Sequence, residues 1–126
     1  MSGLKLATLA VGAAALLSAP AWAHHSAAMF DRQKTSSVTG TIKLFQFANP
    51  HAWLYVTSAE GGVQKEYNIE MTSPNLLGRA GWRPGTLKTG DKVVVRYHPF
   101  RDGTTGGQIV DVTLPNGKVM NEQAVN

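Results

Sequence analysis

The sequence contains no cysteine among its 126 residues, so no disulfide can stabilise the fold and no thiol is present for lipid attachment. It also lacks an apolar run long enough to cross a bilayer, because residues 6–17 fall short of the roughly 20 residues that a membrane helix requires. Charged residues make up only 16% of the chain and are scattered along it. Without a basic stripe that carries aromatic side chains, nucleic acid is not an expected partner.

The first 23 residues have the three parts of a secretory signal: a basic Lys5, the apolar run, and the small residues Ala21 and Ala23 before a cleavage site. We therefore predict cleavage between Ala23 and His24, which gives a periplasmic or secreted protein with no stable membrane anchor. The loss of Lys5 leaves 11 basic and 8 acidic side chains in the 103 residues that remain. That length suffices for one domain with its own core.

Downstream of the signal, apolar and polar residues alternate with the period of two that is typical of β-strands. Gly40 interrupts the first and long run, which predicts a bulge or a bend there. Val38, Ile42 and Leu44 are predicted to share one face of this strand. The five predicted strands cover residues 38–47, 52–57, 63–71, 92–97 and 108–114.

One short helix is predicted after the third strand. Ser73 can cap the free backbone amides, and Pro74 suits the first helical position. Gly81 predicts the end of the helix. Three strands, one helix and two further strands form the element order of a five-stranded oligonucleotide/oligosaccharide-binding (OB) barrel. We therefore predict an all-β, OB-like fold, with an open five-stranded sandwich as the competing arrangement.

The domain boundaries follow from these elements. We predict that the barrel occupies residues 37–120. An N-terminal arm of residues 24–36 precedes it and is expected to be pinned to the domain by Phe30. A short tail of residues 121–126 follows the last turn. No internal repeat and no linker interrupts the chain.

The four histidines provide the candidate chemistry. His24 and His25 begin the predicted mature chain, His51 lies between the first two strands, and His98 begins the loop between the last two. In an OB-like barrel these two loops flank the ligand face. The topology therefore predicts that His51 and His98 approach each other despite the 46 residues between them.

A terminal histidine can chelate a metal ion through its amine and its imidazole, and another imidazole would supply a third nitrogen. Nitrogen ligands with open positions suit copper(II), with nickel and zinc as competitors. Cleavage one residue earlier would place a histidine third in the chain, which also suits copper or nickel. Binding should weaken as the pH falls, because both donors must be unprotonated. Met29 and Met71 are soft donors for copper(I), or simply core residues.

Other interpretations stay open. His51 and His98 also suit ordinary loop positions, and two terminal histidines can be inert. Trp53, Tyr55 and Tyr67 either line a ligand face or pack against the barrel. The sequence shows no catalytic set, and Glu66 and Glu70 on one strand face are typical of a solvated surface. The function predicted is a non-enzymatic binding domain with copper; the alternatives are a metal-free module for an envelope protein or glycan, and a copper-dependent oxidative enzyme.

Several short motifs resemble a family of small exported bacterial proteins that is known only as a domain of unknown function. The resemblance spans nearly the whole predicted mature chain and implies a single exported domain, but it implies no activity and no site residues. The most specific motif is Asn49-Pro50-His51-Ala52-Trp53. The others are His24-His25-Ser26, Phe30-Asp31, Thr39-Gly40, Ser73-Pro74-Asn75, Gly81-Trp82 and Leu87-Lys88-x-Gly90-Asp91.

Overall fold

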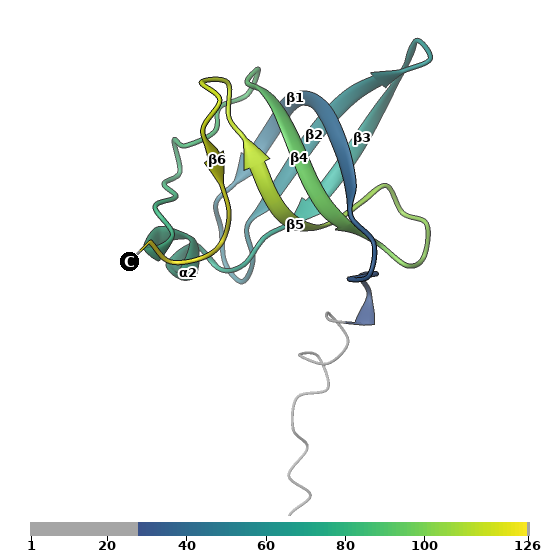
Figure 1. The fold of residues 1–126 in the computed structure, drawn as a ribbon. Helices are drawn as coiled ribbons and strands as arrows, with labels where there is room; N and C mark the ends of the chain where they lie inside the picture. Colours follow the sequence, from purple (N-terminus) through teal and green to yellow (C-terminus); the bar gives the residue numbers. More distant parts are fainter. Residues whose placement is uncertain (1–27, 126) are drawn as a thin grey trace, which may run out of the picture.

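The structure, a computed structural model, describes residues 28–125. Its strands wrap into a barrel with a short helix at one end, and the β2–β3 hairpin projects beyond the barrel (Figure 1). The helix lies between β3 and β4, as predicted. The elements are β1 (Ser36–Gln46), β2 (Trp53–Glu60), β3 (Val63–Glu70), α2 (Pro74–Arg79), β4 (Lys92–Pro99), β5 (Gly106–Thr113) and β6 (Val119–Met120).

The barrel closes through a parallel pairing of β3 with β5. The strands follow the order β3-β2-β1-β4-β5-β6, and Asn68 and Glu70 of β3 pair with Gly106 and Gln108 of β5. This closure confirms the predicted five-stranded OB-like barrel. The sixth strand was not predicted. It pairs with β5 at Val112 and Thr113, and it leads into a segment that the sequence left as a tail.

Strand β1 pairs with both β2 and β4, because it bends. Thr41 pairs with Thr57 of β2 and also with Lys92 of β4. A side chain at Gly40 would lie 2.3 Å from the Thr57 carbonyl oxygen, so only glycine permits this close approach. The register shifts between Ile42 and Leu44. Leu44 was predicted to share a face with Ile42, but the bulge turns it outward and leaves its side chain exposed.

The core fills the inside of the barrel with apolar side chains from every one of the five barrel strands, and α2 and the segment after it close one end. The Ser73 hydroxyl accepts a hydrogen bond from the Leu76 N–H, which confirms the predicted cap. Trp82, which the sequence placed in a loop, is fully buried. The largest fully buried side chains are those of Trp82, Phe30, Ile42, Leu54, Ile69, Leu77, Val56, Val95 and Val112.

Both chain ends pack onto the barrel. Phe30 is buried, forms a β-bridge with Phe100, and confirms the prediction that it pins the arm. At the other end of the chain, the indole N–H of Trp82 donates to the Asn121 carbonyl oxygen at 2.8 Å. None of the helices in residues 28–125 has the length and the apolar character that crossing a membrane demands.

Candidate functional site

His51 lies beside the carboxyl end of β3, where backbone hydrogen bonds fix its neighbour. The Ala52 N–H donates to the Thr72 carbonyl oxygen at 3.1 Å, and the Met71 N–H donates to the Ala52 carbonyl oxygen at 2.9 Å. The His51 Nδ1 atom contacts the Glu70 carboxylate. The Glu70 side chain is only 13% exposed, whereas that of His51 is 43% exposed. The carboxylate thus orients the ring through one nitrogen and leaves Nε2 for a ligand.

A small polar cavity of about 150 Å³ opens at this contact. It brings together segments that are distant in the sequence: the arm, the β1–β2 loop, the end of β3, strand β5 and the tail. Its lining is mainly polar or ionisable, which is the environment that suits a hydrated or charged ligand rather than an apolar one. The lining residues are Phe30, Arg32, His51, Glu70, Met71, Thr72, Gln108 and Glu122.

Glu122 brings a second carboxylate to the cavity. Burial raises the pKa of its carboxyl group, and the hydrogen bond from the Thr72 N–H and the charge of His51 only partly counteract this. That hydrogen bond reaches Glu122 across 50 positions of sequence. Its dependence on tail packing explains why no pattern in the sequence singled Glu122 out.

His98 lies on the same outer surface of the barrel but outside the cavity lining. It pairs with Gln108, which in turn pairs with Glu70. Two strand spacings put the Cα atoms of His98 and Glu70 about 10 Å apart. No hydrogen bond or ion pair within residues 28–125 joins His98 to His51, because each ring has a different partner. The His98 Nδ1–H donates to the Lys34 carbonyl oxygen at 2.7 Å, so this ring anchors the arm.

The predicted ligands His24 and His25 lie outside the described residues, as do the signal segment and its cleavage site. The arm reaches the barrel at Phe30, which lines the same cavity as His51. Phe30 follows His24 by six positions, and an extended chain of that length spans at most about 20 Å. His24 is therefore close enough along the chain to reach the cavity.

The described part of the chain does not form a metal site by itself. Within residues 28–125, no group of three or more His, Asp or Glu side chains has a geometry that could hold a metal ion. Met71 lines the cavity but is buried in the core, and Met29 on the arm is exposed.

The three aromatic side chains that were candidates for a ligand face do not all lie on one face. Trp53 and Tyr55 lie half-buried on the outside of β2, with their rings stacked at a centroid distance of 6.5 Å. The pairing register joins Trp53 to Gln46 on one side and to Glu70 on the other. Tyr67 does not join them: it faces the barrel interior and its ring lies 6.2 Å from that of Tyr97.

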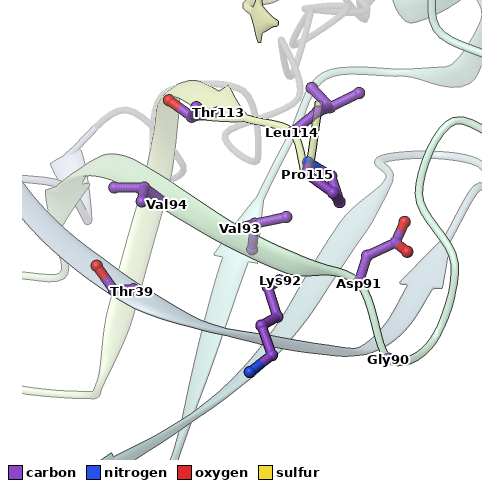
Figure 2. Close-up of a pocket in the computed structure, with 9 residues that line it drawn as sticks. All are labelled: Thr39, Gly90, Asp91, Lys92, Val93, Val94, Thr113, Leu114 and Pro115. Atoms are coloured by element: carbon purple, nitrogen blue, oxygen red, sulfur yellow. The ribbon is translucent and has the colours of Figure 1, made fainter. Parts of the chain in front are cut away.

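A wider hollow of about 480 Å³ lies elsewhere, between the start of β4 and the end of β5. Figure 2 shows Thr39, Val94 and Thr113 on three neighbouring strands beside it. Its two charged side chains are Asp91 and Lys92, and the Asp91 carboxylate accepts a hydrogen bond from the Lys88 N–H at 2.9 Å. This hollow has the single carboxylate of Asp91 and no imidazole in its lining, whereas the smaller cavity combines His51 with Glu70 and Glu122.

The sequence analysis treated Glu70 as part of a solvated strand face, together with Glu66. Glu66 fits that description, because it is paired with Lys43 on the outside. Glu70 does not, since the β1–β2 loop folds His51 over it. Alternation along a strand gives the face of a side chain but not the loop that covers it.

The chain belongs to a family of unknown function (DUF6152), whose family model matches residues 13–109. No curated protein matches the sequence. Among solved structures, a mitochondrial single-stranded DNA binding protein of S. cerevisiae, Rim1, is similar with 18% identity and a TM-score of 0.48. The match covers 64% of this chain and 91% of that chain.

Proposed function

We propose that this member of the family is an exported binding protein that holds a transition metal ion, preferably copper(II), between its N-terminal arm and His51. The carrying observation is that Glu70 holds Nδ1 of His51 at a cavity that the arm also lines. A carboxylate behind an imidazole is the usual outer-shell arrangement of a metal-binding histidine. The ligands would be the amine and imidazole of His24, released by cleavage, together with Nε2 of His51.

The chemistry of these donors favours copper(II). Two imidazoles and one amine form a nitrogen-rich set, which suits copper(II) more than the harder or softer ions. The amine and both rings bind only when they are unprotonated. Affinity should therefore fall as the pH is lowered from 7 to 5, and the bound ion should be released into acidic buffer.

The test uses residues 24–126 with the native terminus, isolated from the periplasm, where intact mass also checks export and cleavage. We expect one copper(II) per chain and nitrogen hyperfine structure in its EPR spectrum. His51→Ala and His24→Ala should each weaken binding by more than about 10-fold, because a ligand matters at least as much as its outer shell. Leu76→Ala, at an exposed position on α2 outside the cavity lining, is the control.

A second form of the protein sharpens the test. One additional residue before His24 removes the free amine from the histidine but keeps both imidazoles. We expect this form to bind copper(II) more weakly than the native chain. The proposal fails if copper uptake stays well below one ion per chain, or if His24→Ala and His51→Ala bind as tightly as Leu76→Ala.

A metal-free interaction with an envelope glycan or protein is a second candidate, favoured by the stacked pair of Trp53 and Tyr55. Amide side chains flank the pair, because Gln46 pairs with Trp53 and Asn68 pairs with Tyr55. The neighbouring carboxylates Glu66 and Glu70 disfavour a polyanion, so a neutral oligosaccharide is the first probe.

Titration of the chelator-treated protein with neutral oligosaccharides tests this candidate. Because Trp82 is fully buried, a fluorescence change would report on Trp53. Trp53→Ala should abolish the response, whereas Leu76→Ala, at an exposed site on α2, should retain it. Equal binding by both variants would contradict a role for the aromatic pair.

A further inference from the structure

One side of the barrel exposes basic side chains without acidic ones. Figure 1 shows α2, β6 and the chain after β6 together on this side, while the β2–β3 hairpin projects away from it. The Val125 N–H donates to the Arg79 carbonyl oxygen at 3.4 Å, and a hollow of about 320 Å³ is lined by the end of α2, by β6 and by the tail. Residues 71–90 and 112–121, which build most of this side, contain no aspartate or glutamate. We name it the α2–β6 face, and its exposed side chains are Leu76, Arg79, Arg83, Lys118, Val119 and Val125.

The three cations of the α2–β6 face have no counter-charge. Arg79, Arg83 and Lys118 form no ion pair within residues 28–125, whereas five basic side chains elsewhere each pair with a carboxylate. Arg83 is held beside α2, because its guanidinium donates to the Gly78 carbonyl oxygen at 3.0 Å. The one acidic side chain of the tail, Glu122, is half-buried and lines the small cavity instead. The face therefore attracts anions.

Aliphatic side chains lie beside these cations. Leu76, Val119 and Val125 are 47%, 56% and 77% exposed, so half of the six exposed large apolar side chains of residues 28–125 gather here. Cations next to aliphatic groups suit a lipid interface, where the charges meet headgroups and the apolar groups enter the acyl boundary. Nucleic acid would require aromatic rings for base stacking, and Trp82, the one aromatic residue of the two stretches, is fully buried.

We infer that the α2–β6 face docks reversibly on the surface of a bilayer that contains anionic phospholipids. This inference goes beyond the proposed function, since no side chain of the face lines the His51 cavity. Each cation near an anionic surface strengthens binding about 5-fold, and salt weakens this contribution. Insertion of the aliphatic groups adds a contribution that salt does not screen. In this orientation the β2–β3 hairpin points away from the bilayer (Figure 1).

The experiment measures sedimentation of the chelator-treated protein with vesicles of phosphatidylglycerol and phosphatidylcholine in equal parts, or of phosphatidylcholine alone. The protein is purified without the apolar residues 6–17, as its intact mass shows. We expect binding to the anionic vesicles that weakens with added salt, and little binding to phosphatidylcholine alone. Lys118→Gln should weaken binding about 5-fold. Lys65→Gln, which removes the same charge from the hairpin, should leave it unchanged.

Leu76→Gln tests the aliphatic contribution. Because half of the leucine side chain is exposed in the free protein, its loss should weaken binding about 5-fold, and the loss should persist at high salt. Val63→Gln is the matched control, since Val63 is also exposed but lies on the hairpin.

Three results would overturn the inference. The first is no sedimentation with the anionic vesicles, and the second is equal weakening by Lys118→Gln and Lys65→Gln. The third is a general affinity for polyanions: Lys118→Gln weakens binding to a single-stranded DNA oligonucleotide as much as to vesicles, and Leu76→Gln affects neither. Copper uptake is measured separately on the same preparation, so a failure of vesicle binding leaves the metal proposal standing.

Discussion

Glu70 contacts the ring of His51 at one end of the β2–β3 hairpin, and near the other end Glu60 accepts a hydrogen bond from Tyr67. Both contacts join a carboxylate to a ring. The hydroxyl oxygen is the single polar atom of the Tyr67 side chain. Because it already bonds to Glu60, this side chain has no second polar atom for a ligand. His51 has a second nitrogen, and its ring lines a cavity that the arm and the tail also reach. The same kind of contact is thus structural at one end and a candidate site at the other.

Phe30→Ala should have the largest effect, because it removes the side chain that holds the arm at the His51 end. Phe30 is 1% exposed and its ring lies 5.1 Å from that of Phe100. Truncation of a buried phenylalanine should lower the free energy of unfolding by about 3 kcal/mol, measured by urea denaturation. Leu76→Ala, at an exposed position, is the control. Equal stability of the two variants would show that Phe30 does not pin the arm.

Glu70→Gln should show that the Glu70–His51 contact supports copper binding, whereas the Glu60–Tyr67 contact does not. We expect copper(II) affinity to fall about 10-fold, because the amide orients His51 less firmly and makes Nε2 a weaker donor. Glu60→Gln changes the other contact and should leave copper binding unchanged in the same titration. If both variants bind copper like the wild type, the Glu70 contact is structural, as the Tyr67 contact is.

Tyr67→Phe should have the smallest effect at neutral pH and a clear signature in alkali. The hydrogen bond to Glu60, followed by burial, raises the pKa of Tyr67 to about 12 from its ordinary value of 10. The folded state therefore holds the phenolic proton more tightly than the unfolded state. The stability that this proton contributes is fully present below pH 10 and is lost as the pH rises to about 12.

Urea denaturation at pH 9 to 12 checks this prediction. Tyr67→Phe should be less stable than the wild type at pH 9, and the difference should shrink as the pH rises. A difference that stays constant over this range would mean that the hydroxyl does not gain stability from Glu60. Copper binding at neutral pH should be the same in both proteins.

Much of the fold was predictable because its signals are local. Period-two alternation located the five strands, and Ser73-Pro74 located the helix, since each pattern reports on neighbours a few positions away. The bulge after Ile42 was harder. Gly40 indicated that β1 must bend, but the position of the extra residue depends on how β1 meets β2 and β4 together. Leu44 was assigned to the wrong face for this reason.

The candidate site was predictable only in part. A histidine in the β1–β2 loop and a Phe30 that pins the arm could be read from residue type and position. Glu70 and Glu122 could not, because a glutamate on a strand or in a tail is ordinary until a distant segment covers it. Tyr67 shows the same limit, since alternation put it on a defined face without saying that this face is the barrel interior.

The sequence by itself determined the order of the elements, the helix cap and the family to which the chain belongs. Only the tertiary structure decided that His51 rests on Glu70, that the arm and the tail meet there, and that His98 serves as an anchor. The physical reason is the distance along the sequence over which each interaction acts. Strand periodicity and capping act over a few residues, whereas this cavity forms where side chains 19 and 50 positions apart are packed together.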